Sequence, residues 1–343
     1  MKHNRKKVFV FLLMIVMILP GCARYEEKKS TTIRVGVVLY TQDDPYINAL
    51  TDCLKKNFEE MESDDLRIIM TVRDGKDDQS VQDDVVEEVI DAGCDVLCVD
   101  LVDRTAPSNI IGMAKKENIP IIFFNREPVW EDLMQWEKIY YIGGDAKQSG
   151  VMQGEIAADV INANGQVDRN QDGKIQYVLL EGEAGHQDAI IRTDCCVKTL
   201  IGQGIELEKL SYQFADWNRA QAENKMTQLL ERYGAQIELV LANNDEMALG
   251  AAAAYDKLGY SSEQRPIIFG IDGLKEALTA VQEGTIQGTV YQDKEGQAMQ
   301  MAKLAVDLFR GNSLTQYEFQ NGKYIILPYQ KVDLTNISEY LEE

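Results

Sequence analysis

The stretch Ile119-Pro-Ile-Ile-Phe-Phe124, which runs directly into Asn125-Arg-Glu127, decides the fold class of this chain. An apolar run without polar alternation is typical of a parallel strand that is buried on both faces. Similar short runs recur along the sequence, at Ile33–Tyr40, Leu66–Val72, Val96–Leu101, Tyr140–Ile142, Tyr177–Leu180, Glu206–Leu210, Leu239–Ala242, Ile267–Ile271 and Gly288–Tyr291. Amphipathic helical patterns alternate with them, at Pro45–Met61, Val81–Ala92, Gln148–Asn162, Asp188–Gln203, Arg219–Tyr233, Asp245–Leu258 and Leu274–Glu283. Repeated strand–helix units predict an α/β fold built from doubly wound parallel sheets.

These strand–helix units are too numerous for one compact sheet, so we expect two domains with a seam near Gly143-Gly144. In such sheets, ligands bind outside the carboxyl ends of the strands. Polar side chains follow the apolar runs at those ends, at Asp43-Asp44, Asn125-Arg126-Glu127, Asn243-Asn244-Asp245, Asp272 and Gln292-Asp293. The alternative for each is a helix cap, because polar caps follow strands in every α/β protein. Their recurrence favours a cleft lined by ligand-binding groups.

The first residues predict export. A basic segment precedes an unbroken apolar run from Val8 to Leu19, which is too short to span a bilayer permanently and is typical of a secretory signal. Leu19-Pro-Gly-Cys22 then resembles a bacterial lipobox, whose cysteine is lipidated and becomes the new N-terminus. We therefore expect a signal peptide over residues 1–21 and a lipidated Cys22 with a flexible spacer over residues 22–32, which anchor the chain to the outer face of a cell membrane. The alternative is an ordinary signal peptide that leaves Cys22 as a free thiol.

The composition excludes several classes of protein. The chain has 35 Lys and Arg against 56 Asp and Glu, and its formal charge of −21 becomes about −25 without residues 1–21. Such a surface repels nucleic acid, so we expect no nucleic-acid partner. Beyond Cys22 the number of cysteines is odd, and Cys195 and Cys196 are neighbours, so we expect buried free thiols rather than a disulfide framework. His186 is the only histidine after residue 21, which excludes a histidine-rich zinc site.

A loop of alternating oxygen side chains predicts a calcium site. In Asp168-Arg-Asn170-Gln-Asp172-Gly173-Lys174-Ile-Gln176, oxygen ligands fall at positions 1, 3, 5 and 9 of an EF-hand-like loop, with glycine at the sharp turn of position 6. Lys174 contributes its backbone carbonyl at position 7, and hard oxygens suit Ca²⁺ rather than a transition metal. Position 12 is Leu179, where an EF-hand needs a glutamate, so a carboxylate from elsewhere must complete the shell. The alternative is an Asn/Asp/Gly turn without a metal.

A set of motifs occurs along the chain in one characteristic order: Asp44, Asn125-Arg-Glu-Pro128, Tyr140-Tyr-Ile-Gly143, the Asp168–Gln176 loop, Gly182-Glu-Ala-Gly-His186-Gln-Asp188 with Arg192, Ala242-Asn-Asn-Asp245 and Phe269-Gly-Ile-Asp272. Together they resemble the galactose/glucose-binding proteins of bacterial ABC sugar transport, which are type I periplasmic binding proteins. The resemblance runs from about Ile33 to about Asp333. The calcium loop distinguishes this branch from its ribose-binding relatives.

The resemblance implies which residues bind ligand and metal. It implies sugar contacts from the polar residues Asp44, Asn125, His186, Asp188, Arg192, Asn244 and Asp272. It implies stacking aromatics at Tyr46, a position that is commonly Phe, and at Trp217. Gln292 stands where the family usually has Asn, which affects the fine ligand preference. Glu238 matches the carboxylate that completes the calcium shell of Asp168, Asn170, Asp172, Lys174 and Gln176.

The resemblance also implies two lobes joined by a three-segment hinge, one over residues 33–142 and 294–325 and the other over residues 143–293 and 326–343. It implies a monomer that closes on a monosaccharide of the galactose or glucose type and delivers it to an ABC permease. A sugar-sensing co-receptor for a chemoreceptor or a sensor histidine kinase is the alternative, because its binding chemistry is the same.

The side chains of this set suit a sugar. Carboxylates accept hydroxyl protons in short bonds, asparagine donates and accepts, and arginine donates from a planar fork. Tyr46 and Trp217 would cover the apolar faces of a pyranose. The alternatives are a core position for Trp217 and a structural role for His186. The polar run Ala215-Asp-Trp-Asn218 and the closeness of His186 to Asp188 favour the site.

An enzyme and a repressor are the remaining classes. Asp188 and Arg192 are an (i, i+4) pair, so we expect the ionised form of Asp188 to be favoured, which argues against a general acid for glycoside hydrolysis. No G-x-S-x-G elbow, phosphate loop or dinucleotide fingerprint follows the first strand. A LacI-type repressor would need an N-terminal helix-turn-helix and a basic face. We therefore expect a binding protein and not an enzyme.

Overall fold

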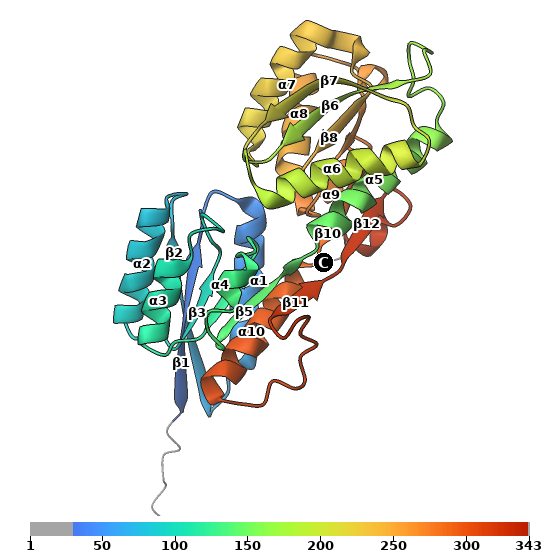
Figure 1. Ribbon diagram of the computed structural model, residues 1–343. Helices are drawn as coiled ribbons and strands as arrows, with labels where there is room; N and C mark the ends of the chain where they lie inside the picture. The colour runs from blue at the N-terminus through green and yellow to red at the C-terminus, as the bar shows by residue number, and fades with distance from the viewer. Residues whose placement is uncertain (1–29, 342–343) are drawn as a thin grey trace, which may run out of the picture.

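The computed structural model describes residues 30–341, which form two lobes side by side (Figure 1). The predicted signal peptide and Cys22 lie outside the described residues. Lobe 1 is built on a parallel sheet in the order β11-β5-β4-β3-β1-β2, and lobe 2 on a sheet in the order β12-β10-β9-β8-β6-β7. In lobe 2 the edge strand β12 runs antiparallel to β10, and the other pairs are parallel. The predicted fold class, two doubly wound sheets joined by a three-segment hinge, is confirmed.

Helices cover both faces of each sheet (Figure 1). Lobe 1 consists of β1 (Thr31–Leu39), α1 (Pro45–Met61), β2 (Leu66–Asp74), α2 (Gln79–Asp91), β3 (Val96–Val99), α3 (Ser108–Lys116), β4 (Ile121–Phe124), α4 (Trp130–Leu133), β5 (Ile139–Gly144), α10 (Lys294–Arg310) and β11 (Tyr324–Leu327). Lobe 2 consists of α5 (Ala146–Ala163), β6 (Ile175–Glu181), α6 (Gln187–Gly202), β7 (Leu207–Phe214), α7 (Arg219–Tyr233), β8 (Leu239–Ala242), α8 (Asp245–Lys257), β9 (Ile267–Phe269), α9 (Lys275–Gln282), β10 (Gly288–Gln292) and β12 (Tyr329–Asp333). Short 3₁₀ turns η1 (Gly234–Gln236), η2 (Ser262–Gln264) and η3 (Ile337–Glu339) complete lobe 2.

Every predicted strand is present, and the missed elements have physical causes. The central strands β3, β4 and β8 are buried along their whole length, so their apolar runs were readable. By contrast, β12 is an edge strand of sequence Tyr-Gln-Lys-Val-Asp in which exposed polar residues separate the buried ones. The other strand that was not predicted, β11, is an edge strand of four residues. The helices α3, α4 and α10 were also not predicted. The longest of them, α10, packs against α1 in lobe 1 and follows the second crossing between the lobes.

The chain crosses between the lobes after β5, after β10, and at Pro328 between β11 and β12. Strands β5 and β11 run to Gly144 and Leu327, beyond the predicted boundaries at residues 142 and 325. The helices that follow a crossing pack closely on their own lobe. A side chain at Gly150 of α5 would bring its Cβ within 2.6 Å of the carbonyl oxygen of Arg192, so the glycine lets α6 approach α5. This close approach holds α6 where its first turns face the other lobe.

The cysteines of the described residues are free thiols. Cys94, Cys98 and Cys196 are buried, as predicted, whereas Cys53 and Cys195 are only half-buried. Burial raises the pKa of each of these thiols, to about 12 for Cys94. The neighbours Cys195 and Cys196 do not form a bridge, in line with the strain that such a bond would impose.

Candidate functional site

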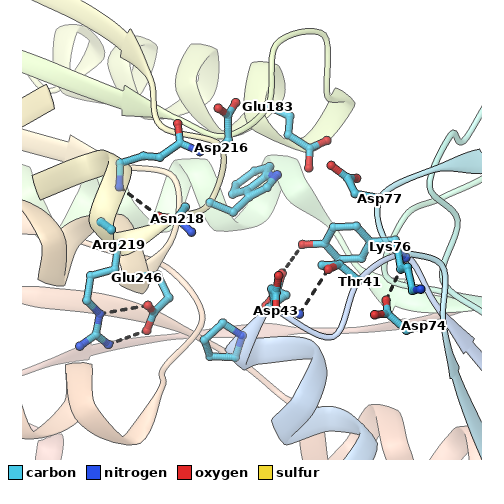
Figure 2. A pocket seen from close by; sticks show the side chains of 16 residues that line it. Thr41, Asp43, Asp74, Lys76, Asp77, Glu183, Asp216, Asn218, Arg219 and Glu246 are labelled. Carbon is cyan, nitrogen blue, oxygen red and sulfur yellow. Dashed lines mark hydrogen bonds and ion pairs between the residues drawn. The ribbon is translucent and has the colours of Figure 1, made fainter. Parts of the chain in front are cut away.

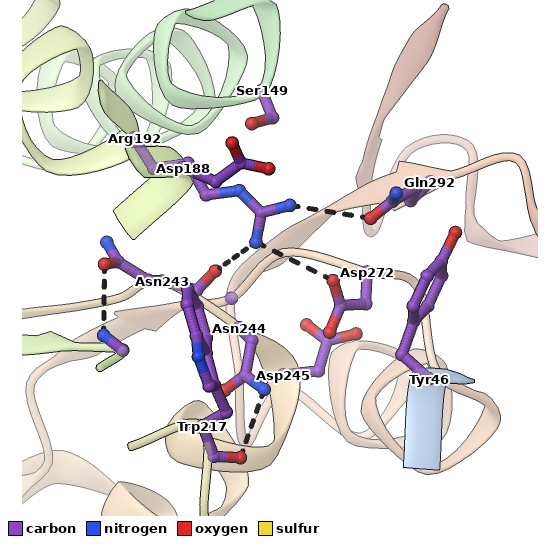
Figure 3. Close-up of polar contacts among 12 residues, drawn as sticks. Tyr46, Ser149, Asp188, Arg192, Trp217, Asn243, Asn244, Asp245, Asp272 and Gln292 are labelled. Carbon is purple, nitrogen blue, oxygen red and sulfur yellow. Dashed lines mark hydrogen bonds and ion pairs between the residues drawn. The ribbon is translucent and has the colours of Figure 1, made fainter. Parts of the chain in front are cut away.

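A cavity lies between the carboxyl ends of the two sheets, and both lobes line it (Figure 3). Its free space is small, about 40 Å³. The lining residues are Tyr40, Asp44, Tyr46, Asn125 and Arg126 from lobe 1 and His186, Asp188, Arg192, Trp217, Asn244, Asp272 and Gln292 from lobe 2. The structure therefore brings together every residue that the sequence pointed to as a sugar contact. Tyr40 was not predicted, and Arg126 was expected at a strand end that lines the cleft but not as a sugar contact.

Three lining residues are also helix caps. Oδ1 of Asp44 accepts hydrogen bonds from the backbone N–H groups of Tyr46 and Ile47 at 2.8 and 3.2 Å, at the start of α1. Nδ1 of His186 accepts from the N–H of Asp188 in α6, and Oδ1 of Asn244 accepts from the N–H of Met247 in α8. The cap and the ligand-group interpretations of these residues are therefore compatible. Oδ2 of Asp44 also accepts from the hydroxyl of Tyr40 at 2.6 Å, and Nδ2 of Asn244 donates to the carbonyl of Trp217 at 3.2 Å, so both caps are tied into the cavity wall.

Arg192 is buried at the centre of the lobe 2 wall. Its Nη1 donates to the carbonyl of Asn243 at 2.8 Å, and its Nη2 donates to the hydroxyl of Tyr329 at 3.1 Å and to Oε1 of Gln292 at 3.5 Å. Its Nη1 also lies 3.9 Å from Oδ1 of Asp272. These contacts, drawn in part in Figure 3, fix the guanidinium plane and orient Gln292 and Asp272 beside it. The Nε–H of Arg192 is buried and has no acceptor within the described chain, which suits a ligand oxygen.

Two aromatic side chains stand on opposite sides of the cavity in Figure 3. Trp217 has a left-handed backbone (φ 59°) and packs edge-on against the ring of His186, with the centroids 5.0 Å apart. Gly182 has no room for a side chain because the Trp217 ring lies against it, so this glycine helps set the position of the indole. Tyr46 is buried, and its hydroxyl accepts a hydrogen bond from Gln297 at 3.1 Å. The indole and the phenol are therefore both held before a ligand arrives.

Side chains from the two lobes meet at the cleft. Nη2 of Arg126 donates to Oε1 of Glu183 at 2.7 Å, and Nε2 of Gln187 donates to Oε2 of Glu127 at 3.2 Å. The guanidinium of Arg126 also lies 3.8 Å above the ring of Tyr40. At this mouth Asp77 of lobe 1 faces Glu183 and Asp216 of lobe 2 (Figure 2), and both aspartates raise the pKa of Glu183. Burial is the largest cause of that rise, and Arg126 opposes it.

Two carboxyl groups of the cavity wall, those of Asp188 and Asp272, are less acidic than usual. Burial raises the pKa of Asp188, and Arg192 only partly offsets it. Arg192 lowers the pKa of Asp188, as the (i, i+4) spacing led us to expect, but burial outweighs this effect and the net shift is upward. Arg192 also pairs with Asp272. Burial also raises the pKa of Asp272 well above its usual range. Burial together with nearby arginines lowers the pKa of His186 well below 6.5, so this imidazole is neutral at pH 7.

The predicted calcium ligands converge on one loop of lobe 2. Glu238 is buried, and its carboxylate joins the two ends of the loop by accepting from the N–H groups of Arg169 at 2.6 Å and Gln176 at 3.0 Å. Asp168 accepts from the N–H groups of Asp172 and Gly173, and the loop turns at Gly173 with φ 81°. Lys174 extends its ammonium toward Glu208, 3.5 Å away, so its side chain does not occupy the loop.

The amide side chains of the loop test whether a cation fits. Nδ2 of Asn170 and Nε2 of Gln176 both donate to the same atom, Oδ2 of Asp172, at 3.1 and 2.9 Å. Turning each amide by 180° would aim both carbonyl oxygens at this position, so the donor set fits a hard cation. Among the described residues, no three His, Cys, Asp or Glu side chains are grouped closely enough to hold a metal. The predicted set relies instead on amide and backbone oxygens as well as carboxylates.

Two doubly wound lobes around a polar, aromatic-lined cavity define a two-lobed solute-binding protein. Residues 35–313 match the periplasmic binding protein domain family, and the chain belongs to that family. The chain is 36% identical over 313 residues to the D-galactose/methyl-galactoside binding periplasmic protein of Haemophilus influenzae, covering 90% of this chain and 92% of that one. It is 29% identical to a putative rhizopine-binding protein of Rhizobium meliloti, covering 89% and 92% of the two chains.

Solved structures agree with the assignment. An ABC transporter solute binding protein from Bacillus halodurans, solved with bound myo-inositol, superposes with a TM-score of 0.75 at 28% identity, covering 91% of this chain and 98% of that one. A periplasmic solute binding protein from Actinobacillus succinogenes with bound D-allose has a TM-score of 0.76 at 20% identity, covering 90% and 100%, and shows the shared fold alone. The resemblance seen in the sequence is confirmed, as is the prediction of a binding protein rather than an enzyme.

Proposed function

We propose that this protein is an extracytoplasmic solute-binding lipoprotein that binds a monosaccharide of the D-galactose/D-glucose type between its lobes and delivers it to an ABC permease. The observation that carries the proposal is the composition of the cavity wall, in which carboxyl, amide and guanidinium groups alternate with Tyr46 and Trp217. Hydroxyl groups need partners that donate and partners that accept, and the wall supplies both. The relative from Haemophilus influenzae, named for binding D-galactose and methyl-galactoside, supports the choice of hexose.

The charges of the wall favour an uncharged ligand. Asp44, Asp188 and Asp272 share the cavity wall with Arg126 and Arg192, so acidic and basic groups balance one another there. A sugar phosphate would place its anionic group against these carboxyl groups in a site with little water, which costs affinity. A neutral hexose can engage both the acceptors and the guanidinium donors. The site therefore suits a free sugar.

Ca²⁺ is part of the proposal as a structural ion. The loop from Asp168 to Gln176, closed by Glu238, would hold the ion. The ion would stiffen the segments that lead into β6 and β8, and it would not contact the sugar. The ion would offset the negative charges that Asp168, Asp172 and Glu238 bring to this loop. Removal of the ion is therefore expected to lower stability more than sugar affinity.

Anchoring through Cys22 and a monomeric state complete the proposal. None of the helices within residues 30–341 has the length and apolar character of a membrane span. A lipid on Cys22 with the spacer over residues 22–32 would keep the lobes near a membrane permease at a high effective concentration. Mass spectrometry of the membrane-extracted protein tests the anchor, since a diacylglyceryl group adds mass to a chain that begins at Cys22. Light scattering tests the monomer.

The binding claim is tested by titrating purified protein with D-glucose and D-galactose, with calorimetric heat and tryptophan fluorescence as readouts. We expect saturable binding of at least one hexose. Folded protein that responds to neither aldohexose would contradict the proposal. A thermal-shift screen across aldohexoses, pentoses and inositols then ranks the ligands.

The alternative role is a sugar-sensing co-receptor for a chemoreceptor or a sensor histidine kinase, because the closed lobes would present the same surface to either membrane partner. A deletion of the gene separates the two roles. Loss of sugar uptake supports delivery to a permease. Normal uptake with a lost transcriptional or chemotactic response supports the co-receptor.

A further inference from the structure

Asp100 lies behind the cavity wall at the carboxyl end of β3. Its side chain is completely buried. Its backbone is fixed on two sides, because its N–H donates to the carbonyl of Val38 in β1 at 2.9 Å and its carbonyl accepts from Nε2 of Gln82 in α2 at 2.7 Å. Hydrogen bonds made by a buried carboxyl group are strong because little water competes for them, so such a group can fix the orientation of its partners.

The Asp100 carboxylate holds the amide of Asn125. Nδ2 of Asn125 lies 3.1 Å from Oδ2 and 3.3 Å from Oδ1 of Asp100. An ionised carboxylate only accepts hydrogen bonds, so it selects the amide orientation in which Nδ2 points back and Oδ1 points away. Asn125 lines the cavity, has a left-handed backbone (φ 56°) and has its carbonyl held by the hydroxyl of Tyr141 at 2.8 Å. Its side chain is therefore the movable part of an otherwise fixed residue.

Asp100 also holds the next residue, Arg126. Oδ1 of Asp100 accepts from the N–H of Arg126 at 3.4 Å, and the guanidinium of Arg126 donates to the carbonyl of Val102 at 2.7 Å. The other end of that guanidinium reaches Glu183 of lobe 2. One buried carboxyl group thus supports an amide that faces the cavity and the residue that bridges the lobes.

We propose that Asp100 is a positioning residue of the binding site, which fixes the end of the Asn125 amide that faces the ligand and makes ligand affinity depend on its own ionisation. The affinity part of this inference rests on the proposed sugar-binding function. Neither Asp100 nor its contact with Asn125 was predicted from the sequence, where Asp100 fell inside the apolar run Val96–Leu101.

Asp100 changes its protonation state within a pH range at which the folded protein can be studied. Burial raises its pKa to about 8, Arg126 and the Asn125 hydrogen bond oppose the rise, and Asp44 adds to it. Tyr40 and Tyr141 also interact electrostatically with Asp100, while their hydroxyls donate to Asp44 and to the carbonyl of Asn125. Burial raises the pKa of both tyrosines well above 10. Once protonated, Asp100 has a hydroxyl that can donate to Oδ1 of a turned amide, so the orientation of Asn125 is no longer fixed.

The first test needs no sugar. The side-chain NH₂ resonances of Asn125, assigned by their loss in an Asn125→Ala variant, are followed by NMR of the ¹⁵N-labelled protein from pH 6.5 to 9.5. We expect a chemical-shift change with a midpoint near pH 8 in the wild type and none in Asp100→Asn. Resonances of the wild type that do not respond to pH across this range overturn the inference, even if the variant fails to fold.

The second test measures hexose affinity by calorimetry over the same pH range. Locking the amide as an acceptor should make binding about three- to tenfold tighter at pH 9.5 than at pH 6.5, the worth of about one hydrogen bond. Asp100→Asn should vary by less than about twofold. The control is Asp132→Asn, because Asp132 is also a buried carboxyl of lobe 1 with a pKa raised by burial but lies outside the cavity wall. The control should keep the wild-type profile.

The two proposals fail in different ways. Absence of hexose binding at every pH, with the Asn125 resonances still titrating, contradicts the sugar-binding function and leaves the positioning role of Asp100 standing. Hexose binding that is equally pH-dependent in the wild type and in Asp100→Asn contradicts the role of Asp100 alone.

Discussion

The guanidinium of Arg126 in lobe 1 lies 2.7 Å from the carboxylate of Glu183 in lobe 2, so this ion pair joins the two lobes across the cleft. The Arg126 side chain is 5% exposed and that of Glu183 is 28% exposed, which shields the pair from much of the solvent. Asp77 and Asp216 add negative charge around Glu183. Without Arg126, the carboxylates of Asp77, Glu183 and Asp216 would repel one another at the mouth of the cleft. The ion pair offsets this repulsion and connects the two lobes.

Replacing this carboxylate should favour the open arrangement of the lobes. We expect Glu183→Gln to raise the ligand-free radius of gyration in small-angle X-ray scattering and to weaken hexose binding by roughly fivefold, or about 1 kcal/mol for a partly exposed pair. The control is Glu276→Gln, which removes one of the two carboxylate partners of Arg219 within lobe 2, where the groups of Arg219 and Glu276 lie 2.6 Å apart. An unchanged radius together with unchanged affinity in Glu183→Gln would show that the ion pair does not govern closure.

Trp217 should contribute much of the binding energy. Trp217→Ala removes the aromatic face beside His186 and is expected to weaken hexose binding by about 30-fold or more, or about 2 kcal/mol. Calorimetry measures the affinity, since the variant also lacks a fluorophore. Trp130→Ala serves as control because Trp130 is 41% exposed and lies outside the cavity wall, so it should bind as the wild type does. If the wild type, Trp217→Ala and Trp130→Ala bind hexose with equal affinity, Trp217 does not contact the ligand.

The metal proposal predicts a calcium-dependent melting temperature. Chelator should lower the melting temperature of the wild type by several degrees, and added Ca²⁺ should restore it. Asp172→Ala should melt at the same temperature with and without chelator, because it removes Oδ2 of Asp172, the atom that the side-chain amides of Asn170 and Gln176 both contact. Glu231→Ala removes an exposed carboxylate from α7 and should respond to chelator as the wild type does. If exhaustive chelation leaves the melting temperature of the wild type unchanged, the loop is a turn without a metal.

His186 should make the protein sensitive to acid. Burial and the nearby arginines hold its folded-state pKa well below 6.5, so the unfolded chain takes up a proton that the folded chain excludes. Stability contributed by the neutral imidazole is therefore present above about pH 6.5 and is lost as the pH falls below that value. His186→Asn keeps a capping oxygen for the N–H of Asp188 and should show a shallower decline of melting temperature between pH 6.5 and 5. The two proteins should melt alike at pH 7.5, and parallel declines in acid would exclude this role.

Much of the fold and the cavity wall followed from the sequence, because strand ends are readable. Asn125 directly follows the fully buried strand β4, Asn244 comes two residues after the fully buried strand β8, and the carboxyl ends of parallel strands meet at one edge. Tyr40 was missed because it continues the apolar run of β1 and has the composition of a core residue. The contact between Arg192 and Tyr329 was not predicted, because the resemblance placed residues 326–343 in lobe 2 but no pattern in the sequence shows which side chain of that segment reaches Arg192.

The family resemblance gave more than periodicity could. It selected Trp217 and His186 from loops that carry no regular pattern, and the structure sets their rings 5.0 Å apart. The resemblance did not show how far burial offsets the effect of neighbouring charges on the pKa of a cavity carboxyl group. The net upward shift of the pKa of Asp188 was not predicted, because a sequence shows that Arg192 lies one helical turn away but not how little water surrounds the pair.

The double use of Asp44, His186 and Asn244, as helix caps and as parts of the cavity wall, restricts how a lineage descended from this protein can change its ligand. A substitution at any of them alters the free energy of unfolding together with the free energy of binding, so most variants there would be purged before a new preference could be tested. Gln292 and Tyr46 cap no helix. We therefore expect natural relatives that have adopted new ligands to differ first at these two positions and to retain the capping residues longest.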